Sequence, residues 1–346
     1  MRVLVAMSGG VDSSVAAALL AEEGHEVVGA TMKLWGGPSD TGCCSVADVE
    51  DARRVAQQLG IAHHVFNFTE QFDRDVVDPY VSAHASGQTP NPCVECNRHL
   101  KFDRFLDRAD DLGFDAIATG HHARVAHDAG TWRLERGADG AKDQSYVLHM
   151  LGQDALARTL FPVGTMTKAE VREHAARLGL RTATKPDSQD VCFISRTGGR
   201  ETFLGDRIPL SPGTIVDLDG REVGSVDAVE LVTVGQRRGL GAISPPTKAD
   251  RRYALEVDVD AGRVTVGTLD DLMVDRIEIR DVTWTDEPLP EGAVVGVQVS
   301  AHGAPFTASW RGNGVIVCDE PVRRVAPGQS VVFYSGDAVA GGGLAV

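Results

Sequence analysis

The chain has 346 residues, of which 42% are hydrophobic and 24% charged, and 49 Asp and Glu against 34 Lys and Arg give a formal net charge of -15. At about 150 residues per domain, this length predicts two to three domains, and the composition excludes disordered and fibrous classes. No apolar stretch is long enough to span a bilayer, and Met1 leads straight into Arg2–Ala6 without a signal-peptide pattern. We therefore expect a cytoplasmic protein whose acidity argues against indiscriminate binding to nucleic acid.

The first two hundred residues alternate short apolar runs with helical periods. The runs predict strands at Val3–Ala6, Val27–Met32, His64–Phe68 and Ala116–Thr119. Helices are predicted at Ser14–Glu23 and Val46–Leu59, each followed by a glycine stop, and Thr167–Glu170 forms a capping box that opens another helix. This pattern is typical of a doubly wound parallel sheet with helices on both faces, and we assign residues 1–200 to one α/β catalytic domain.

After about residue 205, the helical periods give way to alternating strands with Gly, Pro and Asp turns. Tyr253–Asp258 and Arg263–Gly267 flank a short turn and predict a hairpin. We expect two small β-rich domains in this part of the chain, a central one at residues 201–272 and a C-terminal one at residues 273–346.

A glycine-rich loop, Ser8–Ser13, lies between the first predicted strand and the first predicted helix. Its glycines permit close backbone approach, and the amides of a helix N-terminus point at a bound anion. The loop lacks the ending of a Walker A motif and the G-x-G-x-x-G dinucleotide pattern. It resembles the pyrophosphate loop of ATP pyrophosphatases, which cleave ATP to AMP and pyrophosphate while adenylating a substrate oxygen. That resemblance gives Asp12 a part in organising the phosphates and magnesium.

Cys96 follows Asn91–Glu95 and precedes a predicted helix at Asn97–Leu112. A thiol at a helix N-terminus near basic side chains is favoured as the thiolate, which is the form that acts as a nucleophile. At about 100° per residue, one face of the helix collects several bases and either meets a phosphate backbone or is an ordinary solvated face. These bases are Arg98, Lys101, Arg104 and Arg108.

Cys192 lies within Lys185–Ile194, where a buried structural cysteine is the default interpretation. Further motifs along the chain are Thr119–His121, Lys142–Gln144, Lys185–Ser188 and Gly235–Gly241. Together with the phosphate loop and Asn91–Cys96, these motifs resemble the tRNA-specific 2-thiouridylase family of the MnmA type. The resemblance runs in order over nearly the whole chain.

The resemblance implies an ATP pyrophosphatase-type catalytic domain, a central β domain and a C-terminal β-barrel. It also implies a sulfurtransferase that uses ATP and Mg²⁺ to replace the 2-oxygen of the wobble uridine of tRNA with sulfur. The positions that match the ATP site are Ala6, Met7, Ser8, Gly9, Gly10, Val11, Asp12, Ser13, Met32 and Gly120. The positions that match contacts to the target base or tRNA are Asn91, Pro92, Cys93, Lys142, Asp143, Gln144, Ser300 and Ala301.

The same resemblance implies a role for two cysteines. Cys192 would receive sulfur as a persulfide, and Cys96 would be the nucleophile that releases it, leaving a transient disulfide between the two. The implied partners are the anticodon stem-loop of tRNA and a persulfide donor or relay protein. No resident metal site is expected.

Three positions depart from the family pattern. The family often has Asp where Cys93 stands and Tyr where His122 stands, and Ser300–Ala301 replaces an Arg-Tyr pair that contacts tRNA. Because Cys93 adds a third thiol, an iron-sulfur cluster on Cys93, Cys96 and Cys192 is an alternative sulfur carrier. Cys43 and Cys44 are interpreted as structural or incidental, and Cys318 as a core residue.

Two other classes of function remain open at this stage. An enzyme with the same adenylating loop that forms amides needs neither cysteine. An ATP-sensing RNA-binding module predicts no tRNA-dependent release of pyrophosphate.

Overall fold

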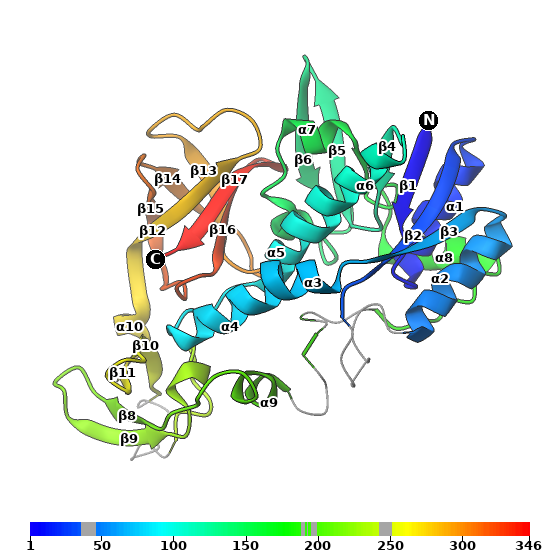
Figure 1. Ribbon diagram of the computed structural model, residues 1–346. Helices are drawn as coiled ribbons and strands as arrows, with labels where there is room; N and C mark the ends of the chain where they lie inside the picture. Colours follow the sequence, from blue (N-terminus) through cyan, green and yellow to red (C-terminus); the bar gives the residue numbers. More distant parts are fainter. Residues whose placement is uncertain (36–45, 188–190, 192, 195–198, 242–250) are drawn as a thin grey trace.

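The computed structural model describes residues 1–35, 46–187, 191, 193–194, 199–241 and 251–346. Its strands form three sheets: a parallel sheet, a central four-stranded sheet and a barrel sheet that a hairpin from the N-terminal part joins (Figure 1). Among the described residues, no helix is long and apolar enough to cross a membrane.

The N-terminal sheet is parallel, with strand order β3-β2-β1-β4-β7. Its strands are β1 (Arg2–Ala6), β2 (Glu26–Lys33), β3 (Ala62–Asn67), β4 (Ala116–Ala118) and β7 (Thr159–Leu160). The four predicted strands are confirmed with shifted ends, whereas the two-residue strand β7 was not predicted. In chain order, β2 and β3 are added on one side of β1. The next strand, β4, is added on the other side of β1. This reversal opens a crevice at the carboxyl ends of β1 and β4, where ligands of such sheets bind.

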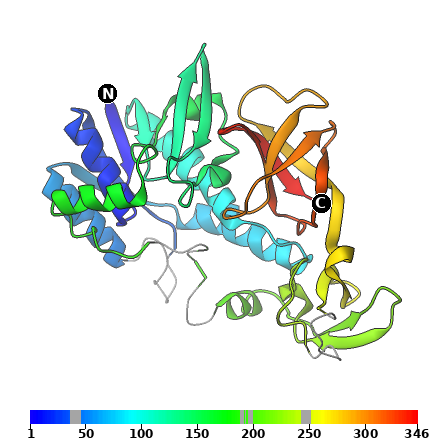
Figure 2. The same ribbon diagram turned by 180° about the vertical axis from the view of Figure 1, so that it is seen from behind.

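Helices cover both faces of this sheet, which confirms the doubly wound prediction. On one face lie α1 (Val11–Glu22), α2 (Val46–Leu59) and α8 (Lys168–Arg177), which share one hydrophobic cluster and are seen side by side in Figure 2. On the other face lie α3 (Thr69–Phe72), η1 (Asp73–Val77), α4 (Asp78–Ala85), α5 (Pro92–Glu95), η2 (Cys96–Arg104) and α6 (Phe105–Asp111). The predicted capping box is present at Thr167, whose side chain and that of Glu170 each accept the other's backbone amide.

A hairpin departs from the N-terminal unit and joins the last sheet. Its strands, β5 (Ala123–Asp128) and β6 (Thr131–Arg136), are antiparallel, and Glu135 pairs with Ala338 of the C-terminal part. The helices η3 (Ser145–Leu148) and α7 (Gln153–Ala157) follow it. The sequence did not predict this hairpin, which ties the barrel to the catalytic unit.

The central part forms a four-stranded sheet of order β10-β11-β8-β9. Its elements are α9 (Gly199–Gly205), β8 (Gly213–Val216), β9 (Glu222–Val226), η4 (Val229–Leu231), β10 (Tyr253–Asp258), β11 (Arg263–Gly267) and α10 (Leu269–Leu272). The predicted hairpin is confirmed, because β10 and β11 pair antiparallel. Apolar side chains from all four strands form its core.

The C-terminal part is a closed barrel. Its strands are β12 (Met273–Trp284), β13 (Val294–Gln298), β14 (Phe306–Trp310), β15 (Val315–Arg323), β16 (Ser330–Ser335) and β17 (Ala338–Ala345). They pair in the order β12-β15-β14-β13-β16-β17, and β12 also pairs with β17, so the barrel has no open edge. Cys318 lies in the barrel core, as predicted, and burial raises the pKa of its thiol to about 11.

Candidate functional site

The phosphate loop connects the carboxyl end of β1 to α1. Gly9 has φ +73°, and a Cβ there would lie 2.3 Å from the backbone oxygen of Asp48, so the loop admits only glycine at this position without rearrangement. Gly10 is the N-cap of α1 and provides no side-chain cap for the first amides of the helix. Those uncapped amides and the close backbone approach suit a bound phosphate.

The other positions matched to ATP gather around this loop. A Cβ on Gly120 would lie 2.5 Å from the backbone nitrogen of Ser13, so the loop after β4 packs directly on the start of α1. Ala6 pairs with Ala30 in β2, and Met32 lies two residues further along that strand. Met7 is 1% exposed and packs in the core, so its side chain supports the loop and does not line its surface. The cradle therefore fits a nucleotide at the edge formed by β1, β2 and β4.

Asp12 is held by two side chains that come from other parts of the chain. Lys168 Nζ donates to both carboxylate oxygens, at 2.8 and 2.7 Å, and His122 Nε2 lies 3.3 Å from Oδ1. Burial alone would raise the pKa of Asp12, but the hydrogen bonds with His122 and Lys168 and the Lys168 charge outweigh it and lower the pKa. Asp12 is thus ionised beside the loop.

No group of three or more His, Cys, Asp or Glu side chains suited to a metal ion occurs within the described residues. Mg²⁺ that is bound with a nucleotide usually takes one or two protein carboxylates and keeps water and phosphate oxygens as its other ligands. Asp12 fits this requirement, because its ionised carboxylate lies in the first turn of α1.

A second carboxylate, Asp187, collects three cations. Its oxygens lie 2.8 Å from Lys142 Nζ, 3.0 Å from Lys168 Nζ and 2.6 Å from an Arg172 nitrogen. Burial raises the pKa of Asp187, but the hydrogen bonds from Lys142 and Lys168 lower it well below its ordinary value. Asp187 therefore links Lys142 and Arg172 to Lys168, which holds Asp12 in the phosphate loop.

Lys185 is another lysine that contacts the phosphate loop. Its ammonium donates to the Gly9 carbonyl at 2.9 Å and to the carboxylates of Asp48 and Asp51 at 2.6 and 2.8 Å. Burial alone would lower the pKa of Lys185, but the carboxylates of Asp48 and Asp51 together raise it by more. The net pKa is therefore raised, and the side chain is charged. This hydrogen bond to the Gly9 carbonyl holds the peptide between Gly9 and Gly10 in one orientation.

The environment of Cys96 differs from the predicted one. The helix begins at Pro92, with Asn91 as its N-cap, and the Cys96 amide already donates to the Pro92 carbonyl. The helix therefore starts a turn earlier than Asn97, and Cys96 lies at the end of the first turn, where the effect of the helix dipole is declining. Cys96 is 8% exposed and packs in the large core cluster, on the face of the sheet that η2 and α6 cover.

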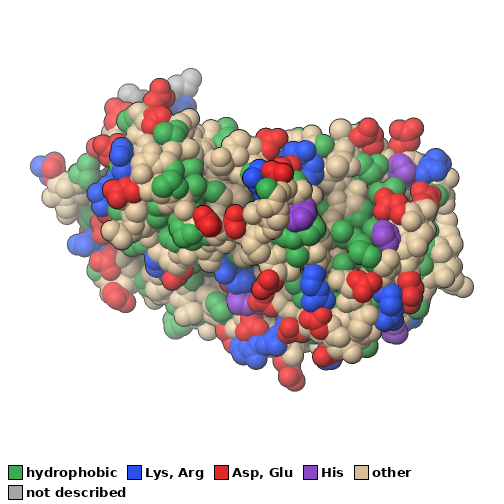
Figure 3. Space-filling model, turned by 90° about the horizontal axis from the view of Figure 1, so that it is seen from above, with side chains coloured by type: hydrophobic (Ala, Val, Ile, Leu, Met, Phe, Trp, Pro, Cys, Tyr) green, Lys and Arg blue, Asp and Glu red, His purple; other side chains and the backbone are tan. Residues whose placement is uncertain are grey.

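The expected basic helix face is also altered. Residues Cys96–Arg104 form a π-helical segment, so the side chains do not follow the α-helical spacing on which the prediction rested. Three of the bases pair with acids on the same run, in the pairs Arg98–Glu95, Arg104–Asp107 and Arg108–Asp111. On the face drawn in Figure 3, basic and acidic side chains of the described residues are likewise interspersed. The solvated-face interpretation fits this helix better than a continuous phosphate-binding surface.

The described residues include three of the six cysteines, Cys93, Cys96 and Cys318. Asn91 accepts the Cys93 amide at 3.0 Å, so Asn91, Pro92 and Cys93 form the rigid start of the helix that carries Cys96. Cys93, Cys96 and Cys318 form no disulfide with one another. Cys192, Cys43 and Cys44 lie outside the described residues, so the persulfide position, the transient disulfide and the three-cysteine cluster stay predictions.

The segment Lys142–Gln144 lies beside the loop, and its three residues have different surroundings. Lys142 is exposed and contacts Asp187, and the Gln144 side chain accepts the His122 amide at 2.9 Å. Asp143 is turned inward: its carboxylate accepts the amides of Gly137 and Ser145, the Ser145 hydroxyl and the Arg136 guanidinium. Lys142 and Gln144 are therefore the exposed members of this segment, and Asp143 orders the turn that carries them. The contact of the segment with RNA stays a prediction.

The remaining RNA-contact candidates lie on the two β-rich parts. Ser300 and Ala301 follow β13, where their carbonyls accept the Gln298 side chain, and Ala301 packs against the cluster that includes Cys96. In Gly235–Gly241, the Gln236 side chain bridges Thr233 and Arg238, which makes a tight loop with two exposed arginines, Arg237 and Arg238.

Lys168 and Asp187 were not among the predicted site residues. The available signals were the surplus of bases at residues 165–200 and the capping box, which places Lys168 in the first turn of a helix. Neither signal identifies the partner, because the contact with Asp12 spans 156 positions.

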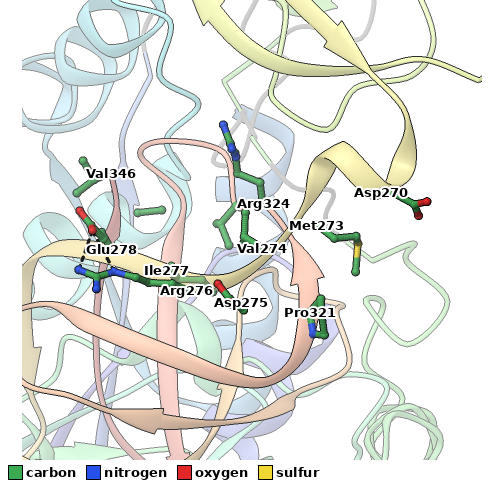
Figure 4. A pocket seen from close by; sticks show the side chains of 12 residues that line it. Asp270, Met273, Val274, Asp275, Arg276, Ile277, Glu278, Pro321, Arg324 and Val346 are labelled. Atoms are coloured by element: carbon green, nitrogen blue, oxygen red, sulfur yellow. Dashed lines mark hydrogen bonds and ion pairs between the residues drawn. The ribbon is translucent and has the colours of Figure 1, made fainter. Parts of the chain in front are cut away.

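A cavity of about 730 Å³ lies along β12, at the junction of the central sheet and the barrel (Figure 4). Its lining includes Met273 and Arg324, and Arg276 donates to Glu278 within it at 2.9 Å. It shares no residue with the predicted ATP or RNA contacts.

The parallel sheet, its switch point and the loop define a protein with an ATP pyrophosphatase-type, or HUP, catalytic domain. The family model described as tRNA methyl transferase HUP domain matches residues 1–196. The models described as tRNA methyl transferase PRC-barrel domain and aminomethyltransferase beta-barrel domain match residues 201–268 and 274–345.

Curated relatives match almost end to end. The tRNA-specific 2-thiouridylase MnmA of Chloroflexus aggregans is 47% identical over 354 residues, covering 99% of this chain and 97% of that protein. Those of Acidothermus cellulolyticus and Corynebacterium kroppenstedtii are 47% and 45% identical, covering 99% of this chain and 96% and 94% of their own lengths. The chain belongs to the tRNA-specific 2-thiouridylase family.

Proposed function

We propose that this protein is a tRNA uridine 2-sulfurtransferase, which adenylates the 2-oxygen of the wobble uridine and replaces it with sulfur. The observation that carries the proposal is the glycine loop at the switch point, with Asp12 and Lys168 beside it, in a chain of this family. Methyl transfer, which the family-model descriptions name, leaves the pyrophosphate loop and the paired cysteines without a role.

In the first step, the uridine 2-oxygen attacks the α-phosphorus of ATP, and the bond to pyrophosphate breaks. The amides of α1 and the ammonium of Lys168 stabilise the negative charge of the leaving pyrophosphate. Mg²⁺, held by Asp12 together with phosphate oxygens, would supply further charge neutralisation. Adenylation is needed because the 2-oxygen by itself is a poor leaving group.

In the second step, the terminal sulfur of a Cys192 persulfide attacks carbon 2 of the base and AMP leaves with the former 2-oxygen. The Cys96 thiolate then attacks the Cys192 sulfur, which releases the transferred sulfur to the base and leaves a disulfide. A thiol reductant must reopen that disulfide before the next turnover.

The partners follow from this chemistry. The anticodon stem-loop of tRNA brings the base, which must leave its stack to reach Cys96, and a persulfide donor or relay protein loads Cys192. We further propose that the protein acts in the cytoplasm and that its chain divides into units at residues 1–200, 201–272 and 273–346.

The test incubates the purified protein with ATP, Mg²⁺, a persulfide donor that loads Cys192, a thiol reductant and an unmodified tRNA transcript, followed by mass spectrometry of the nucleosides. We expect 2-thiouridine together with stoichiometric AMP. Absence of 2-thiouridine contradicts the proposal. Full thiolation by the Cys96→Ser variant would contradict the cysteine relay. Pyrophosphate release that depends on tRNA, survives Cys96→Ser and gives no 2-thiouridine would favour an amide-forming synthetase. Absence of tRNA-dependent pyrophosphate release would favour an ATP-sensing module.

A further inference from the structure

Asp187 connects the phosphate loop to the segment proposed to contact RNA. One of its oxygens lies 3.0 Å from Lys168 Nζ and 2.6 Å from Arg172, and the other lies 2.8 Å from Lys142 Nζ. Lys168 in turn holds the Asp12 carboxylate at the loop. A single carboxylate thus contacts one ammonium from each part of the site.

The backbone that carries Lys142 is anchored at this place. The Gln144 amide donates to the His122 carbonyl at 2.9 Å, and the His122 amide donates to the Gln144 side chain at 2.9 Å. The Lys142 side chain is 43% exposed, whereas that of Lys168 is 12% exposed. The long Lys142 side chain can therefore leave Asp187 for an external anion while its backbone stays in place.

The two lysines compete for the same negative charge. While Lys142 is bound, it neutralises part of the Asp187 charge, and the same contact raises the pKa of Lys142. When Lys142 leaves, Asp187 is less neutralised and attracts Lys168 more strongly. A phosphate bound at the loop then competes for the Lys168 ammonium with a less neutralised Asp187 carboxylate.

We propose that Asp187 is a positioning residue that makes Lys142 and Lys168 interdependent, so that an RNA phosphate on Lys142 weakens the hold of Lys168 on a phosphate at the loop. The coupling between the two lysines is inferred from the geometry. The part that RNA plays in it, by binding Lys142, rests on the proposed function. By thermodynamic linkage the effect is reciprocal. Seated RNA would in this way favour the release of pyrophosphate after adenylation.

The experiment is a double-mutant cycle read by calorimetric affinity for α,β-methylene-ATP with Mg²⁺, a probe that is not cleaved. We expect Lys142→Ala to weaken binding about fivefold in the wild-type background and no more than about twofold, the direct effect of one distant charge, in the Asp187→Asn background. Asp187→Glu keeps the charge and should preserve the larger effect. Arg133→Ala, which removes an exposed base of β6 paired with Asp128, should change nothing.

Equal effects of Lys142→Ala in the two backgrounds overturn the inference. The inference is also overturned if Lys142→Ala binds α,β-methylene-ATP as tightly as the wild type does. This result is independent of whether the Asp187 variants fold, because Lys142 lies on the surface. A second arm adds an anticodon stem-loop RNA, which should lower the affinity of the wild type for the nucleotide more than that of Asp187→Asn. Absence of RNA binding would reject the proposed function, and the link between the lysines would still be decided by the cycle.

Discussion

Lys168 lies 156 positions after Asp12, yet its ammonium donates to both oxygens of the Asp12 carboxylate, at 2.8 and 2.7 Å. The pair joins the first turn of α8 to the first turn of α1, two helices on the same face of the sheet. A cation is thereby fixed beside the amides that would receive a phosphate.

Lys168→Ala should weaken ATP binding by about 10-fold to 100-fold, because it removes a charged hydrogen-bonding partner worth about 1.5–3 kcal/mol and leaves Asp12 to repel the nucleotide. Lys168→Arg should recover part of the affinity. Nucleotide binding by calorimetry and tRNA-dependent pyrophosphate release check both variants. An unchanged affinity of Lys168→Ala would show that the ammonium serves only the folded structure.

Gly9→Ala should abolish pyrophosphate release, since it places a side chain 2.3 Å from the Asp48 carbonyl at a positive φ. The matched control is Gly24→Ala, which has φ +82° and no atom within 4 Å of its Cβ, so it carries the backbone strain without the clash. The control should lose about 1 kcal/mol of stability and keep its activity. Equal loss of activity in both variants would mean that strain, and not the close approach, is responsible.

Cys93 and Cys96 should respond differently to substitution. The relay predicts that Cys96→Ser stops thiolation and that Cys93→Ser retains it, with a persulfide adduct of about 32 Da on Cys192 of the loaded protein. Iron and acid-labile sulfide are to be measured on protein purified without oxygen. Stoichiometric iron that is lost in Cys93→Ser would replace the relay by the cluster alternative.

Asp143→Ala should destabilise the fold by about 3–5 kcal/mol, because it leaves the Arg136 guanidinium, packed 3.6 Å above the Tyr334 ring, without its carboxylate. Asp128→Ala, which breaks an exposed pair with Arg133, should cost less than about 1 kcal/mol. Urea unfolding measures both variants. Normal stability of Asp143→Ala together with weaker tRNA binding would instead make Asp143 a direct contact.

Stability should fall as the pH drops from about 6.5 towards 4, in part because of His149. This residue is 2% exposed, and burial lowers the pKa of its ring to about 4, so the unfolded chain binds a proton in that range that the folded chain does not. His149→Asn keeps a donor for the Tyr146 carbonyl and does not titrate. Between pH 7.5 and 5.5, this variant should lose about 1 kcal/mol less than the wild type, and an equal loss in urea unfolding would refute the assignment.

The sequence by itself determined the local elements and the loop. Alternating apolar runs, glycine stops and the capping box at Thr167 are short-range signals. Four of the five strands of the parallel sheet, α2 and the hairpin of β10 and β11 follow from them with at most small shifts at their ends. The order of the motifs along the chain was sufficient to recognise the family. Each motif and each element signal is contained within a few neighbouring residues.

Only the tertiary structure decided which charges meet and how the barrel is attached. Lys168 with Asp12, and Asp187 with Lys142, are brought together by the packing of helices and loops around the switch point, which no local pattern encodes. The π-helical segment Cys96–Arg104 replaces the ordinary helical period that the sequence suggested, and it buries Leu100 and Phe102 in the core. The hairpin of β5 and β6 pairs with β17 at Ala338, ahead of Gly341–Ala345, where β17 pairs with β12, so its place depends on where these distant strands end.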